Sequence, residues 1–89
     1  MDIPPCFNNM TYAFNQDFFI MYKTMEDVLE AAVTIVPPSE RAELSAYLDR
    51  LLAAGPEVCD DVWNRSATAV FVQPVEALVD LLRDIRARL

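Results

Sequence analysis

The sequence predicts an all-α protein, a compact bundle of four to five short helices, and three observations lead to this prediction. Of the 89 residues, 54% are hydrophobic, which is too large a share for an intrinsically disordered chain. Several stretches repeat apolar residues at intervals of three and four, as one face of an α-helix does. The six prolines and the single glycine fall between these stretches. The length fits a single domain spanning residues 1–89.

The first predicted helix begins after Asn8 or Asn9, because asparagine is a favourable N-cap residue. It is expected to run to about Tyr22. Phe14, Phe18 and Tyr22 are spaced four residues apart and therefore share one helix face. This aromatic face is expected to belong to the core.

The second predicted helix follows Thr24, which is its expected N-cap. Glu26 and Asp27 would then lie in the first turn, where negative charge interacts favourably with the helix dipole. Residues 33–36 are mostly β-branched, so the position at which this helix ends stays open.

The third predicted helix spans Ser39 to Ala54. Gly55 directly after it has the conformational freedom that a helix C-terminus needs, and Pro56 cannot continue the same helix. Whether Ser39 caps this helix or Pro37 occupies its first position stays open. The apolar face consists of Leu44, Tyr47, Leu48, Leu51 and Leu52.

The last third of the sequence predicts a short helix, a connection and a final helix. Residues 56–66 form the short helix, whose apolar side carries Val58, Val62 and Trp63. Residues 67–72 are equally consistent with a buried connection and a short strand. Pro74 is expected at the first position of the final helix. Its inner face and edge comprise Val75, Leu78, Val79, Leu82, Ile85, Arg86 and Leu89.

Charge is the clearest guide to partners. Fourteen acids and seven bases give a net charge of −7, which disfavours direct binding to nucleic acid or to an anionic membrane. Residues 1–62 contain eleven acids and three bases, whereas residues 63–89 contain three acids and four bases. An acidic surface that attracts a basic protein is therefore expected in the first two thirds of the chain.

Composition also argues against catalysis. The chain has no histidine, so it lacks an imidazole base and a histidine metal ligand. The carboxylates do not follow the alternating pattern of a calcium loop, so we expect neither metal nor cofactor and do not expect an enzyme. Cys6 and Cys59 have no C-x-x-C spacing; two free thiols in a cytoplasmic protein are favoured, although a disulfide is formally possible. The N-terminal residues contain no signal-peptide pattern.

One short motif resembles a known family. Residues 12–18, Tyr-Ala-Phe-Asn-Gln-Asp-Phe, are similar to the aromatic-x-Phe-x-Gln-Asp-aromatic signature of helical immunity proteins from bacterial contact-dependent growth inhibition systems, the CdiI family. Phe18 stands where that family often has tryptophan. Residues 24–29, 38–41, 44–52 and 79–85 resemble the later helices of the group in order.

The resemblance implies a stoichiometric inhibitor. Such proteins bind and neutralise the C-terminal toxin domain of a surface-delivered effector, often a nuclease, and a basic nuclease cleft would attract an acidic helical face. We expect a monomer that forms a 1:1 complex and covers the active or substrate site. Gln16 and Asp17 stay open between a structural role and a contact. The alternative is an acidic adaptor or regulator of another basic protein. The candidate toxin contacts are Glu26, Asp27, Glu30, Glu57, Asp60, Asp61 and Trp63. Trp63 is equally consistent with a residue that covers the edge of the bundle.

Overall fold

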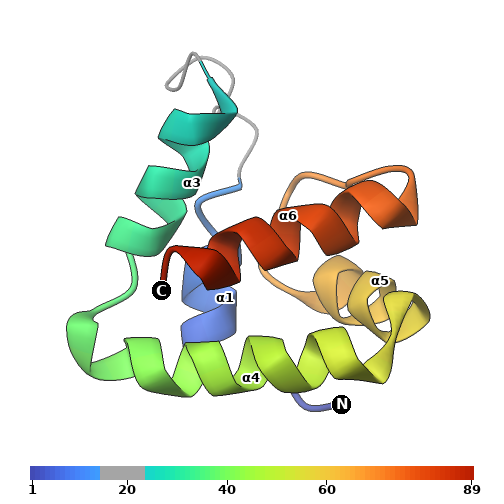
Figure 1. The fold of residues 1–89 in the computed structure, drawn as a ribbon, viewed down its shortest axis with the longest axis horizontal. Helices are drawn as coiled ribbons and strands as arrows, with labels where there is room; N and C mark the ends of the chain where they lie inside the picture. Colours follow the sequence, from blue (N-terminus) through green and yellow to red (C-terminus); the bar gives the residue numbers. More distant parts are fainter. Residues whose placement is uncertain (15–23) are drawn as a thin grey trace.

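Helices that cross one another build the fold, as the computed structural model of the chain shows (Figure 1). It describes residues 1–14 and 24–89, and within these ranges no strand forms. The all-α prediction is therefore confirmed. The helices are α1 (Pro5–Thr11), α3 (Met25–Thr34), the 3-10 helix η1 (Pro38–Glu40), α4 (Arg41–Ala54), α5 (Pro56–Arg65) and α6 (Val75–Ala87).

The start and end of α1 differ from the prediction. The helix begins at Pro5 and not after Asn8 or Asn9, because Pro4 is extended and Pro5 supplies the fixed φ angle of a first helical residue. It ends at Thr11, with Tyr12 as its C-cap, and therefore does not continue unbroken toward Tyr22 as predicted. Phe14 is buried as expected. Phe18, Tyr22, Gln16 and Asp17 lie outside the described residues.

Two predicted helix ends are confirmed in atomic detail. The Thr24 hydroxyl accepts a hydrogen bond from the Asp27 N–H at 3.2 Å, which makes Thr24 the N-cap of α3. Gly55 ends α4 with a φ of +107°, a region that side-chain-bearing residues rarely adopt. Ser39 makes no capping hydrogen bond and lies within η1, which Pro38 begins. Neither proposed start of the third helix is therefore correct.

The chain from α5 to the C-terminus follows the prediction closely. Residues 67–72 form a connection without strand pairing among the described residues. It is held by the Ala69 N–H, which donates to the Phe14 carbonyl oxygen at 2.9 Å. α6 begins at Val75, so Pro74 is its extended N-cap and not its first residue. Leu81 also faces the core, although it was not part of the apolar face predicted for this helix.

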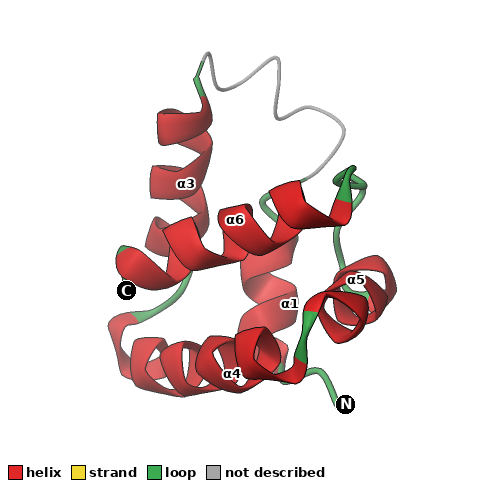
Figure 2. Ribbon diagram, turned by 45° about the vertical axis from the view of Figure 1, so that its right-hand side comes forward, coloured by secondary structure: helices red, strands yellow, loops and turns green. Residues whose placement is uncertain are grey.

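The core lies where α1, α4, α5 and α6 meet. α6 packs on α3, α4 and α5, and α1 is enclosed behind it (Figures 1 and 2). Two edge-to-face aromatic pairs organise the interior: Phe7 with Tyr47, at 5.3 Å between ring centroids, and Phe14 with Trp63, at 5.1 Å. None of the described helices combines the length and apolar content that crossing a bilayer requires. The largest fully buried side chains are Trp63, Phe7, Phe14, Met10, Leu44, Leu48, Leu51, Leu78, Leu82, Ile85, Val36 and Val62.

Candidate functional site

The predicted acidic contacts divide between two helices on opposite sides of the molecule. α3 and α5 are well separated in both views (Figures 1 and 2). α3 carries Glu26, Asp27 and Glu30, and α5 carries Glu57, Asp60 and Asp61. The sequence predicts one acidic face that contains all six side chains. Because they lie on two separate helices, they do not form one continuous acidic surface.

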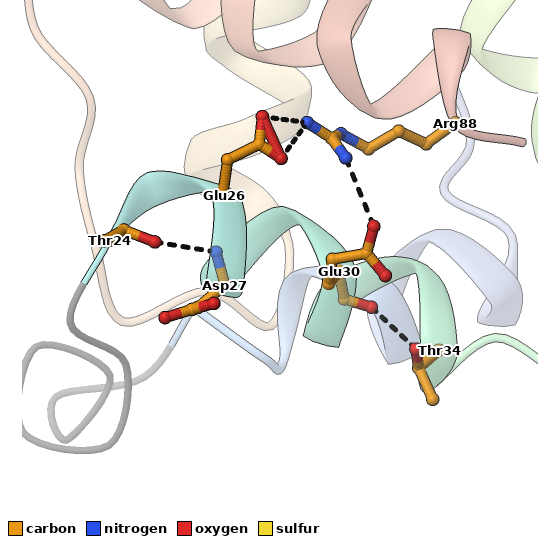
Figure 3. A network of polar contacts seen from close by, with 6 residues as sticks. All are labelled: Thr24, Glu26, Asp27, Glu30, Thr34 and Arg88. Carbon is orange, nitrogen blue, oxygen red and sulfur yellow. Dashed lines mark hydrogen bonds and ion pairs between the residues drawn. The ribbon is translucent and has the colours of Figure 1, made fainter.

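The carboxylates of α3 are partly neutralised within the protein. Figure 3 shows the Arg88 guanidinium between two of them: it donates to Glu26 at 2.6 Å and to Glu30 at 3.3 Å. The hydrogen bond from Arg88 to Glu26 raises the pKa of the guanidinium above its ordinary value. Asp27 has no ion pair with any described residue. Most of the negative charge on α3 therefore fastens this helix to the C-terminus.

Removing the Arg88 side chain should loosen α3. We expect Arg88→Gln to lower the melting temperature at low salt, because Glu26 and Glu30 lose a shared cation. The difference from wild type should shrink in high salt, which screens exposed ion pairs. Arg83→Gln is the control, because Arg83 reaches Asp80 only at 3.8 Å and both side chains are largely exposed. Equal melting temperatures for wild type and Arg88→Gln at low salt would contradict this role.

The carboxylates of α5 are more available. Asp61 pairs with Arg65 at 2.9 Å, and the Arg65 guanidinium also donates to the Met1 carbonyl oxygen at 3.1 Å. Glu57 is exposed and Asp60 half-buried, and neither forms an ion pair with a described residue. α5 therefore presents two carboxylates whose charge no neighbouring cation offsets.

Trp63 is not the surface contact that the sequence suggested. Its side chain is 0% exposed. The indole N–H donates to the Val70 carbonyl oxygen at 2.9 Å, and the ring packs edge-to-face on Phe14. Aromatic residues on an amphipathic helix look alike in sequence whether they face the core or a partner. A partner cannot reach Trp63 in this structure, so the residue is removed from the candidate contacts.

A row of acids on α6 was missed. Glu76, Asp80 and Asp84 are spaced four residues apart and are all exposed. Residues 63–89 contain three acids and four bases, so the net charge of this region gives no sign of an acidic row. Arg86, however, binds Asp49 of α4 at 2.8 Å, and the hydrogen bond lowers the pKa of the Asp49 carboxyl. Because Arg86 and Arg88 pair with α4 and α3, Glu76 and Asp84 have no ion pair with a described residue, and Asp80 has only the exposed contact with Arg83 at 3.8 Å.

A hollow of about 410 Å³ adjoins this acidic row. Asp80 and Asp84 line its α6 wall. Two large apolar side chains also line it although they are well exposed: Phe71 at 66% and Met25 at 54%. The described residues that line it are Phe14, Met25, Val70, Phe71, Val72, Gln73, Ala77, Asp80, Leu81 and Asp84. We call this hollow the α3–α6 groove.

The two cysteines are free and buried, as the sequence favoured. Burial raises the pKa of the Cys6 thiol to about 11, and the hydrogen bond that this thiol donates to Glu43 at 3.4 Å acts in the same direction. Burial also raises the pKa of Cys59. Both thiols therefore stay protonated at neutral pH and are poor nucleophiles.

No cluster of three or more metal-ligating side chains occurs within residues 1–14 and 24–89. Comparison with protein-family models, with curated proteins and with solved structures finds no match for this chain.

Proposed function

We propose that this protein is an immunity protein: it binds the toxin domain of a contact-dependent growth inhibition effector and neutralises it by covering the active or substrate site. The observation that carries the proposal is the excess of acids, fourteen against seven bases. Carboxylates of α5 and α6, those of Glu57, Asp60, Glu76 and Asp84, have no ion pair within the described part of the chain and support a basic partner.

Electrostatics explains why such a surface suits a nuclease toxin. A nuclease must hold a polyanion, so the cleft that binds its substrate carries positive charge. An acidic helical surface is attracted to this cleft and can exclude the substrate from it. The similarity of residues 12–18 to the immunity signature supports a toxin domain as the class of basic partner, which charge by itself leaves open. The proposal implies a cytoplasmic 1:1 complex.

The function is tested by rescue of growth. The toxin is taken from the gene directly upstream, and its C-terminal domain is expressed with and without this protein. We expect growth arrest by the toxin domain and recovery on co-expression. A toxin domain that still arrests growth in the presence of the folded, soluble protein would contradict the proposal.

Electrostatic attraction between this protein and the toxin domain is tested by measuring the association rate constant of the two. Glu57→Gln/Asp60→Asn should lower the association rate constant about threefold to tenfold at low salt, because steering depends on unpaired surface charge. Ser39→Lys/Ala42→Lys is the matched control. It makes the same change in net charge at exposed positions of η1 and α4, on the side of the molecule away from α5. Equal rate constants for the two double variants would contradict steering by α5.

A further inference from the structure

We propose that the α3–α6 groove is the docking site for a basic, amphipathic segment of the toxin domain. This inference rests on the proposed function and identifies the part of the partner that contributes apolar anchors. The groove lies between the start of α3, residues 77–84 of α6 and residues 70–73, so it is built from segments far apart in the sequence.

Phe71 and Met25 supply exposed apolar surface to the groove. Both are large, both are more than half exposed, and both line the same hollow, whose base includes the buried side chains of Phe14 and Leu81. Large apolar side chains gathered at one site commonly mark an interaction surface. A partner side chain placed here would contact apolar atoms from three segments at once. Such enclosed anchors contribute most of the binding energy at protein interfaces.

The negative charge at the wall of the groove favours a partner segment that carries positive charge. Asp80 and Asp84 line one wall, and no lysine or arginine occurs among the described residues that line it. Glu76 continues the row, so the three carboxylates extend over about 12 Å of helix at 1.5 Å per residue. A partner segment with apolar side chains flanked by lysine or arginine satisfies both features. A second copy of this chain, with its own net charge of −7, would be repelled.

The size of the groove agrees with this occupant. Its volume of about 410 Å³ falls within the range of roughly 300–1,000 Å³ that is typical of ligand clefts. That space accommodates the apolar side chains of one helix face, while the flanking basic side chains remain at the rim near Asp80 and Asp84. The apolar contacts of the groove therefore lower the dissociation rate constant of the complex. The carboxylates of α5 and α6 raise its association rate constant.

The first experiment measures binding to the upstream toxin domain. Phe71→Ser should raise the dissociation rate constant about tenfold, because the mutation removes an anchor surface. Ile35→Ser is the matched control: Ile35 is also exposed but lies at the other end of α3 from Met25. Asp84→Lys should weaken binding about tenfold relative to Ser39→Lys/Ala42→Lys, which makes the same change in net charge away from the groove. Wild-type neutralisation with unchanged binding by Phe71→Ser and Asp84→Lys would overturn the groove proposal and leave the proposed function standing.

A second probe does not depend on the toxin. A synthetic amphipathic helix with a leucine face and lysine flanks should shift the NMR signals of Met25, Phe71 and Ala77, whereas the same peptide with glutamate flanks should not. Binding of the lysine peptide without toxin neutralisation would overturn the proposed function and keep the groove as a site for another basic protein. Binding of neither peptide, without neutralisation, would overturn both. Self-association of wild type that Phe71→Ser abolishes would assign the groove to a second copy and overturn the proposal.

Discussion

Replacing Trp63 by alanine is expected to lower the free energy of unfolding by about 3–5 kcal/mol. The side chain is fully buried, its ring packs against Phe14, and its indole N–H satisfies the Val70 carbonyl oxygen. Alanine would leave a large cavity and remove one of the two hydrogen bonds to the Val70 carbonyl oxygen, which would keep only the bond from the Thr68 hydroxyl at 3.0 Å. A domain of 89 residues has a total stability of about 4–13 kcal/mol at roughly 0.05–0.15 kcal/mol per residue. The variant should therefore be largely unfolded or close to unfolding.

Urea unfolding followed by far-UV circular dichroism measures this effect, because the variant lacks the only tryptophan. Trp63→Phe is the matched variant: it keeps an aromatic ring beside Phe14 but loses the N–H donor, so we expect a smaller loss of about 1–3 kcal/mol. If Trp63→Ala cost less than about 1 kcal/mol, the side chain would not be the central core residue that its burial indicates. The same unfolding curves show whether a loss of toxin binding reflects a lost contact or a lost fold.

The helices that could be predicted from the sequence are those whose signals are local. α4 has an apolar residue at every third or fourth position and a glycine immediately after it, and these two features determine where it faces and where it ends. Thr24 followed by acids determines the start of α3 in the same way. Such signals act between residues within one or two turns, so they are readable without the rest of the protein.

The start of α1 was predicted at the wrong residue because two local signals compete there, Pro5 and Asn8. Asn8 has the chemistry of an N-cap, yet its side-chain oxygen accepts a hydrogen bond from the Ala67 N–H at 3.0 Å. The helix instead begins at Pro5, and Cys6 and Phe7 enter the core from its first turn. The proline signal thus sets the start of the helix, and the asparagine side chain serves a tertiary contact instead of a cap.

The candidate site was even less accessible to sequence reasoning. The ion pair of Glu26 with Arg88 joins residues 62 positions apart, and that of Asp49 with Arg86 joins residues 37 positions apart. Counting charges along the chain gives the correct total but not the carboxylates that remain unpaired. The α3–α6 groove likewise combines Met25, Phe71 and Asp84, which no spacing rule connects. Recognition surfaces of this kind follow from the fold and not from a motif.

Phe7 provides the second large test, because its importance is visible only in the structure. We expect Phe7→Ala to lower the free energy of unfolding by about 3–5 kcal/mol. Phe7 is 0% exposed and packs edge-to-face on Tyr47. The Tyr47 hydroxyl in turn donates to the Asp2 carbonyl oxygen at 2.9 Å. Loss of the Phe7 ring would therefore remove core volume and the support for Tyr47 together.

Two variants separate these effects when unfolding is followed by tryptophan fluorescence. Phe7→Leu restores most of the apolar volume and should cost less than about 1.5 kcal/mol. Asn9→Ala, at an exposed position of the same helix, should stay within about 0.5 kcal/mol of wild type. A similar loss for Phe7→Ala and Asn9→Ala would mean that α1 contributes through helix formation and not through burial. The expected order, with Phe7→Ala far below the other two, would establish that the first helix is held by its core contact with α4, because a seven-residue helix is too short to be stable by itself.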